Sequence, residues 1–266
     1  MWMAWLTVTC LLAVAMCTMW FPYRRWNNLS VVDLAWAAGV GVAAVSLSVW
    51  GALAGGNPLR AGLLGGAAGL YALRLTWHLV QRFEPHVEDP RYTAMREGQP
   101  AARQDAYALG TFALQGTVAG LLALPFALAA WDPSPVLSPL IAVGLALAGL
   151  GILLEGLADR QLTRFKADPA HRGQICRVGL WRYSRHPNYF GEWLVWCGFA
   201  LAASPSPLGL AAWLSPAMMW HFLQNVTGIA ATEAHMRRSR GAAYEAYARE
   251  TSAFFPWPPR ATASDE

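Results

Sequence analysis

Residues 179–198 read GLWRYSRHPNYFGEWLVWCG, a basic segment that runs directly into an apolar one. Pro187 can open a helix, and Asn188 and Glu192, four residues apart, would then share one helical face. Desolvating an ionisable group in a membrane helix costs at least about 2.5–3.5 kcal/mol, so such groups mark functional sites. The stretch therefore predicts a membrane boundary beside a polar pocket for an anionic ligand.

The composition places the chain among membrane proteins. Of 266 residues, 55% are hydrophobic and 14% are charged, against roughly 25% charged in soluble domains. Several apolar blocks reach the roughly 20 residues that a membrane-spanning helix needs. We predict an all-α, polytopic membrane protein with one domain, residues 1–266, and no separate soluble part. The seven expected spans are 1–21, 31–54, 60–81, 106–130, 136–157, 188–203 and 207–231.

Basic residues predict the orientation. Eighteen of the 20 Lys and Arg residues fall in the segments after spans one, three and five and in the tail. These four segments lie on one side if the spans alternate, and the positive-inside rule makes that side cytoplasmic. We therefore expect the N-terminus outside and the C-terminus in the cytoplasm. With one Lys against 19 Arg and many Ala and Gly residues, we expect a bacterial protein of the inner membrane.

Several kinds of site are not expected. No GxGxxG follows a strand pattern, and GxxxxGK[ST], HExxH and CxxC are absent from the sequence, so neither a Rossmann or P-loop nucleotide site nor a metal site is predicted. Nucleic acid is not an expected partner, and no protein partner is evident. Gly62, Gly65, Gly66 and Gly69 have small-xxx-small spacing, which indicates close helix packing.

Polar residues concentrate at the expected cytoplasmic ends of the spans, which favours one polar cavity that opens inward. Glu155 and Asp159 share a helical face, and Arg160 and Arg164 do so as well. Arginine forks match phosphate oxygens, and Tyr183 and Tyr189 can stack on adenine or nicotinamide rings. The candidate cofactor-binding residues are Arg74, Glu155, Asp159, Arg160, Arg164, Arg177, Tyr183, Arg185, His186, Asn188, Tyr189, Glu192, Glu233 and Arg237. Alternatively, the basic residues of the loop 160–185 only set the membrane topology and bind anionic lipid headgroups.

The segment 185–192, RHPNYFGE, resembles the signature of the steroid 5-alpha-reductase family, and most closely its bacterial members catalogued as a domain of unknown function. The further matching segments are 30–33 with Trp36, 88–89 with 91–92, 155–161 and 244–256. The shorter pattern RHPxYxG is shared with membrane methyltransferases of the isoprenylcysteine carboxyl-methyltransferase type.

The resemblance implies a seven-span enzyme that uses NADPH to reduce a carbon–carbon double bond conjugated to a ketone. The substrate is lipophilic and steroid-like and enters from the bilayer, as for a 3-oxo-5-alpha-steroid 4-dehydrogenase. The resemblance implies that residues 1–105 form the substrate side and that 106–258 bind the cofactor. It also implies that Tyr71 is the acid at the ketone and that Arg74 contacts a cofactor phosphate. The family pairs this tyrosine with a carboxylate on the second span, where Asp33 is the only acidic residue. The positions that match NADPH contacts are Asp159, Arg164, Arg177, Asn188 and Glu192.

Two alternatives from other classes stay open. The first is a membrane methyltransferase that uses S-adenosylmethionine, although Glu233 is followed by Ala234 where those enzymes show a Glu-Glu pair. The second is a lipid-binding or assembly protein without enzymatic activity, which would leave a polar stripe on the seventh span unexplained. That stripe is His221, Gln224, Asn225 and Gly228. The substrate can be a steroid, another enone or an unsaturated lipid.

Overall fold

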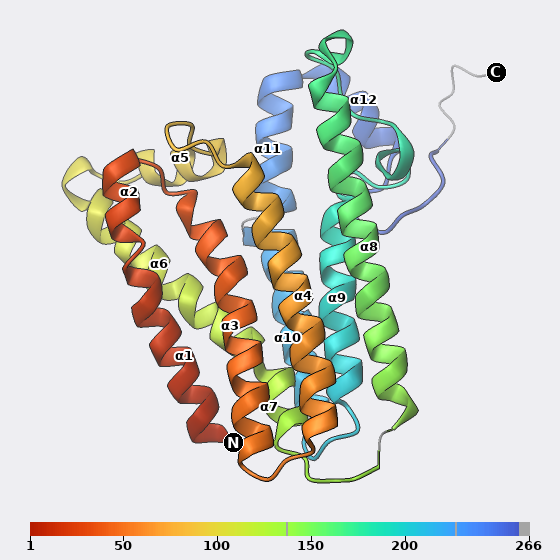
Figure 1. Ribbon diagram of the computed structural model, residues 1–266. Helices are drawn as coiled ribbons and strands as arrows, with labels where there is room; N and C mark the ends of the chain where they lie inside the picture. The colour runs from red at the N-terminus through yellow and green to blue at the C-terminus, as the bar shows by residue number, and fades with distance from the viewer. Residues whose placement is uncertain (137, 227, 261–266) are drawn as a thin grey trace. The chain divides into compact units, whose positions relative to one another are not determined.

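The computed structural model describes residues 1–136, 138–226 and 228–260. Within these ranges the chain forms helices joined by turns and no strand, and the bridge between Ser184 and Ser252 is isolated (Figure 1). The prediction of an all-α protein is therefore confirmed.

The α-helices are α1 (Trp2–Cys17), α2 (Trp20–Trp26), α3 (Val31–Leu53), α4 (Pro58–Arg82), α5 (Pro90–Glu97), α6 (Gln104–Leu122), α7 (Leu124–Ala130), α8 (Pro139–Ala167), α9 (Pro187–Ala203), α10 (Leu214–His221), α11 (Ile229–Arg240) and α12 (Ala242–Glu250). Short 3₁₀ turns are η1 (Ala101–Arg103), η2 (Pro169–His171), η3 (Gly179–Arg182) and η4 (Gly209–Trp213), and η5 (Phe222–Val226) is a π-helix.

Four helical segments of the described chain are long and apolar enough to cross a membrane. They are Trp2–Trp26, Val31–Leu53, Ala101–Ala130 and Pro139–Ala167. The expected spans 60–81 and 188–203 are helical, but α4 carries three arginines and α9 has only 17 residues. The number of seven spans and the orientation of the termini stay predictions.

The expected seventh span, 207–231, is not one continuous α-helix. It is divided into η4, α10 and the π-helix η5 before α11 begins. Sequence periodicity assumes 3.6 residues per turn and cannot detect a π-turn. Asn225 Nδ2 still lies 3.4 Å from His221 Nδ1. A Cβ at Gly228 would lie 2.2 Å from the carbonyl oxygen of Leu223, so only glycine fits after the turn.

The chain forms two compact units. The first comprises Met1–Leu145 and Phe199–Ser215, and the second comprises Ala146–Gly198 and Pro216–Glu266. The division within α8 groups residues 106–145 with the first helices. The assignment of residues 1–105 to the substrate and of 106–258 to the cofactor stays a prediction.

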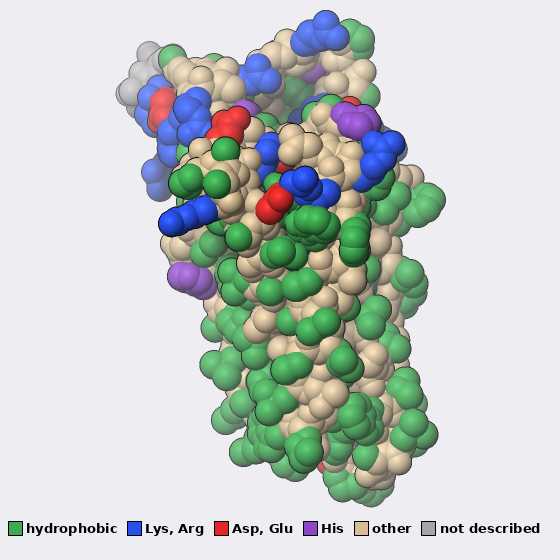
Figure 2. Space-filling view, turned by 90° about the vertical axis from the view of Figure 1, so that its left-hand side faces the viewer, with side chains coloured by type: hydrophobic (Ala, Val, Ile, Leu, Met, Phe, Trp, Pro, Cys, Tyr) green, Lys and Arg blue, Asp and Glu red, His purple; other side chains and the backbone are tan. Residues whose placement is uncertain are grey.

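In the first unit, small residues allow α3 to pack closely on α4 and α1 on α6. A Cβ at Gly41 of α3 would lie 2.4 Å from the Cβ of Ala72 of α4, and a Cβ at Gly116 of α6 would lie 2.7 Å from the Cα of Ala13. All residues of α7 are buried. Figure 2 shows hydrophobic side chains over the length of the face that carries α1 and α6, with charged side chains towards the end that carries α2 and α5. This unit therefore has the apolar surface of a membrane-embedded helix bundle.

Candidate functional site

The contact between α8 and α9, in the second unit, brings four predicted site residues together. A Cβ at Gly191 would lie 2.6 Å from the backbone nitrogen of Glu155, so the two helices touch backbone to backbone. Asn188 Nδ2 donates to Asp159 Oδ1 over 3.4 Å, and Trp196 Nε1 donates to Glu192 Oε1 over 2.9 Å. Three carboxylates are buried here, at 5% to 7% exposure: Glu155, Asp159 and Glu192.

The loop before α9 is folded onto α8. Trp181 Nε1 donates to the carbonyl oxygen of Ala158 over 2.9 Å, and the backbone nitrogen of Leu180 donates to Gln161 Oε1 over 2.8 Å. Gly179 has a φ of +56° and lies against the Gln161 side chain, which a Cβ would meet at 2.4 Å. These contacts therefore fix the loop on α8.

Three of the predicted cofactor arginines form ion pairs with carboxylates. Arg177 pairs with Glu250 at 2.9 Å, and Arg185 pairs with Glu233 at 2.7 Å. Arg237 pairs with Glu233 at 3.1 Å and with Glu245 at 3.0 Å. The sequence patterns did not indicate Glu245 or Glu250 as partners.

Arg160 and Arg164 differ from these three. Both side chains are exposed on α8, and neither has a carboxylate partner among the described residues. They are four residues apart, so their guanidinium groups share one helical face. Among the predicted cofactor arginines of this unit, these two are therefore available to an anion.

Glu233 is the centre of a buried charged cluster. Burial opposes its ionisation, but hydrogen bonds from His186 and Arg185 outweigh this effect and lower the pKa of Glu233 to about 2. Burial lowers the pKa of His186 below its ordinary value, although Glu233 acts in the opposite direction. His186 is then neutral at pH 7 and donates from Nε2 to Glu233 over 3.3 Å. The ring of Tyr189 stacks on that of His186, with centroids 5.4 Å apart.

The C-terminal segment covers the same loop. Ser184 Oγ donates to the carbonyl oxygen of Phe254 over 2.8 Å. The backbone nitrogen of Arg185 donates to the carbonyl oxygen of Ser252, also over 2.8 Å. Arg185 Nη1 also donates to the carbonyl oxygen of Thr251 over 2.6 Å. Ser184 and Arg185 therefore hold the tail on the loop before α9. Tyr183 is 41% exposed, so it remains accessible for stacking.

The two residues predicted to be catalytic lie in the first unit. Tyr71, on α4, is fully buried, and its ring meets Phe199 edge-on at 6.3 Å. Arg74 follows on the same face of α4. Asp33 lies in the first turn of α3 and accepts hydrogen bonds from Tyr92 Oη and from Arg91 Nη2.

The described contacts of Asp33 do not include Tyr71, and their expected pairing stays a prediction. Ala72 packs against Gly41, so Tyr71 lies near the level of Gly41, about 12 Å from Asp33 along the axis of α3 at 1.5 Å per residue. The described partners of Asp33 are instead Tyr92 and Arg91 of α5. Burial raises the pKa of Tyr92 well above its ordinary value, and the negative charge of Asp33 is the next largest cause in the same direction. The only signal for Tyr92 in the sequence was its place in the family-like segment 91–92.

A second set of contacts fixes α5 beside the start of α3. Asn28 Nδ2 donates to the carbonyl oxygens of Glu84, Pro85 and Val87 over 3.1 to 3.2 Å. Glu88 Oε1 accepts from the backbone nitrogen of Leu29 over 2.7 Å. This network connects segments more than 50 residues apart, so no local pattern predicts it.

Comparison with known proteins gives a family match over most of the chain and similarity to two curated proteins over about a quarter of it. The profile of the family described as "Protein of unknown function (DUF1295)" matches residues 19–251. The mouse protein named 3-oxo-5-alpha-steroid 4-dehydrogenase 1 is 37% identical over 68 residues, 26% of this chain and 27% of its own length. The rat protein of the same name is also 37% identical over 68 residues, 26% of each chain. The chain thus aligns with about a quarter of the length of these relatives. No solved structure matches.

Proposed function

Because the chain belongs to the family described as "Protein of unknown function (DUF1295)", we propose that it is a membrane reductase related to steroid 5-alpha-reductases. It uses NADPH to reduce a carbon–carbon double bond conjugated to a ketone in a lipophilic, steroid-like substrate. The observation that carries this proposal is the similarity to two proteins named 3-oxo-5-alpha-steroid 4-dehydrogenase 1. We place the protein in a bacterial cytoplasmic membrane, where its substrate enters from the bilayer. The comparisons do not favour the methyltransferase alternative.

The second unit has side chains that fit NADPH. The exposed Arg160 and Arg164 have no carboxylate partner among the described residues, so their guanidinium groups can bind phosphate oxygens without breaking an ion pair. The exposed ring of Tyr183 offers a surface for stacking. NADPH, when bound, supplies a hydride. NADPH carries one phosphate more than NADH, and contact of these arginines with that phosphate would make the protein prefer NADPH.

Tyr71 is the proton donor of the proposed reaction. Addition of a hydride to the β-carbon of an enone places negative charge on the ketone oxygen, and a buried hydroxyl can stabilise that charge and donate a proton. We assign this role to Tyr71 alone, because the described partners of Asp33 are Tyr92 and Arg91. A general acid contributes about 10²–10⁴-fold to the rate, so Tyr71→Phe should lower turnover by that order and leave NADPH binding nearly unchanged.

Tyr92→Phe is the matched control for Tyr71→Phe. It removes the hydroxyl bound to Asp33 and should change turnover by less than about tenfold, since the general-acid contribution of Tyr71 is retained. Loss of turnover in Tyr92→Phe, with full turnover in Tyr71→Phe, would assign the proton to the Tyr92–Asp33 pair instead.

Cofactor binding is tested by the melting temperature of the purified full chain with NADPH, NADH or S-adenosylmethionine. A ligand at 100 times its Kd stabilises the folded state by about 2.7 kcal/mol. We expect NADPH to raise the melting temperature most, and the Arg160→Ala/Arg164→Ala double variant to lose the difference between NADPH and NADH. Arg172→Ala, at another exposed arginine of the loop, is the control and should keep that difference. Stabilisation by S-adenosylmethionine alone would overturn the proposed cofactor.

A further inference from the structure

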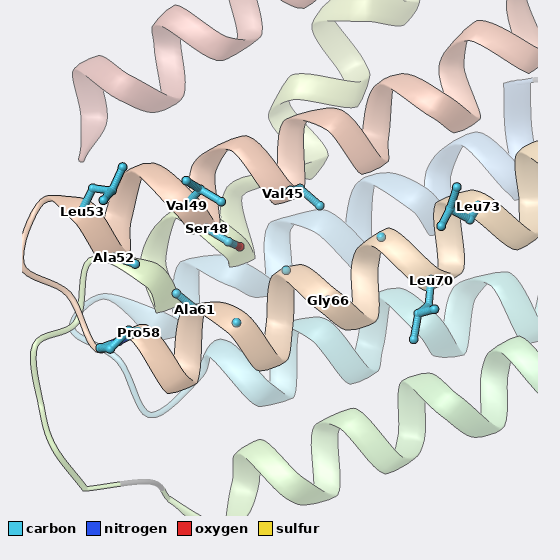
Figure 3. A pocket seen from close by; sticks show the side chains of 13 residues that line it. Val45, Ser48, Val49, Ala52, Leu53, Pro58, Ala61, Gly66, Leu70 and Leu73 are labelled. Atoms are coloured by element: carbon cyan, nitrogen blue, oxygen red, sulfur yellow. The ribbon is translucent and has the colours of Figure 1, made fainter.

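An apolar groove runs between α3 and α4 in the first unit, over the halves of both helices nearest the turn that joins them (Figure 3). Its volume is about 600 Å³, which lies within the range of pockets for small molecules, about 300–1,000 Å³. No Asp, Glu, Lys or Arg lines it. Both helices are part of the expected membrane-embedded region, and α3 is apolar and long enough to span the bilayer.

Glycines of α4 form part of the groove. A Cβ added at Gly62 or Gly66 would meet no described atom within 4 Å, whereas Gly65 lies directly against Ser48. The expectation that all these glycines mark helix packing therefore fits Gly65 but does not account for Gly62 and Gly66. Exposed Val49 on α3 and exposed Leu70 on α4 also line the groove. Open glycines alone would equally suit contact with another helix.

Ser48 adds a polar atom to this apolar groove. Its side chain is 4% exposed, and its Oγ has no hydrogen-bond partner among the described residues. Figure 3 shows the oxygen pointing from α3 towards the glycine face of α4. Three other hydroxyls on the apolar helices of this unit bond the carbonyl oxygen four residues earlier: Thr9, Thr111 and Thr117. Ser48 does not, and the bilayer core offers no water in its place.

We propose that this groove binds one lipophilic molecule from the bilayer whose hydroxyl or keto oxygen forms a hydrogen bond with Ser48. The groove has room for one such molecule, its walls match an apolar body, and its one orphaned polar atom matches a single oxygen. A second copy packed through α4 fits less well, because it would present exposed leucines to Ser48. These are Leu59, Leu63, Leu70 and Leu73.

The groove is separate from the predicted catalytic residues. At 1.5 Å per residue, Ser48 lies about 22 Å from Asp33 along the axis of α3. It lies about 10 Å along the same axis from Gly41, the residue of α3 nearest the level of Tyr71. The proposal does not depend on the proposed reduction. Gly66→Leu should therefore abolish binding in the groove and leave NADPH-dependent turnover unchanged.

The test is photolabelling of the full chain in lipid nanodiscs with a diazirine-bearing sterol alcohol and with the same sterol lacking its hydroxyl. We expect the alcohol to label peptides of α3 and α4 in the groove. Ser48→Ala should lower labelling by the alcohol about fivefold, a typical effect of one hydrogen bond, and leave the deoxy sterol unchanged. Gly66→Leu should lower labelling by both probes.

Gly110→Leu is the matched control, because Gly110 of α6 is also open and exposed, and this variant should label as the parent does. Gly66→Ala replaces Gly66→Leu if the leucine variant does not fold. Equal labelling of the parent, Ser48→Ala and Gly66→Leu by the alcohol would overturn the proposal. A cross-linked dimer that Gly66→Leu abolishes would overturn it in favour of a second copy.

Discussion

Arg60 and Asp132 form an ion pair in the first unit that is almost fully withdrawn from solvent, at 2% and 5% exposure of their side chains. Arg60 Nη2 also donates to the carbonyl oxygen of Val136 over 2.9 Å. Arg60 stands at the start of the expected span 60–81, and no sequence pattern indicates its partner, because Asp132 is 72 residues away along the chain. The pair fixes the segment after α7 to the start of α4.

Removal of one member of this pair should be strongly destabilising, because the other charge would stay buried without compensation. We expect Asp132→Ala to lower the free energy of unfolding by about 3–5 kcal/mol, measured by denaturant titration in detergent. Arg60→Met/Asp132→Leu should recover most of the loss. Arg24→Ala is the control, since Arg24 and Asp105 are 55% and 45% exposed and such pairs contribute about 1 kcal/mol or less. Equal losses in Asp132→Ala and Arg24→Ala would contradict this account.

The cluster of His186 and Glu233 predicts how stability depends on pH. The pKa of His186 is lower in the folded state than its ordinary value of 6.5, so the unfolded chain binds a proton first as the pH falls through 6.5. Stability should therefore be full above pH 7 and decline below 6.5. A second decline should begin near the ordinary pKa of Glu233, 4.5, because its folded value is about 2.

Melting temperatures between pH 7.5 and pH 4 test this dependence. His186→Gln keeps a donor for Glu233 but does not titrate, so it should remove the decline between pH 7 and pH 5 and keep the one below 4.5. His235→Gln is the control and should melt as the parent does at each pH. An unchanged profile in His186→Gln would show that other groups cause the decline.

At the scale of elements, the crossing of α8 and α9 depends on glycine. A Cβ at Gly191 would meet the Glu155 backbone nitrogen at 2.6 Å, whereas Gly149, on the same helix as Glu155, meets no described atom within 4 Å. Gly191→Ala should therefore cost about 1–3 kcal/mol through overpacking, and Gly149→Ala should be neutral or stabilising through its higher helix propensity. Melting of both variants in parallel decides the point, and equal behaviour would disprove the close crossing.

Apolar blocks and start signals allowed several of the long helices to be predicted. Pro187 begins α9 as expected, and the blocks at 31–54 and 136–157 correspond to α3 and to most of α8. The π-helix at Phe222–Val226 could not be predicted, because hydropathy carries no signal for an inserted residue per turn. The position of α5 beside Asp33 depends on long-range bonds of Asn28 and Glu88, which local patterns do not encode.

At the scale of the molecule, the candidate residues divide between the two compact units. Tyr71, Arg74 and Asp33 belong to the first unit, and the other candidate cofactor residues belong to the second. Cofactor binding by these residues stays a prediction. The sequence indicated the helical face that Glu155 shares with Asp159 and the one that Asn188 shares with Glu192, and the structure brings these two faces together. The sequence could not distinguish Arg160 and Arg164 from the arginines already paired with Glu233 and Glu250, since ion pairing is a tertiary property.

The proposed reduction is tested most directly by following the hydride. Membranes that contain the full chain are supplied with NADPH deuterated at the transferable position of C4 and with a 4-ene-3-ketosteroid, and the product is analysed by mass spectrometry. The account predicts a saturated ketone with one deuterium on the former β-carbon, formed at a rate that Tyr71→Phe lowers by about 10²-fold or more. Recovery of unreduced enone, together with methyl transfer from S-adenosylmethionine to a lipophilic acid in the same membranes, would contradict it.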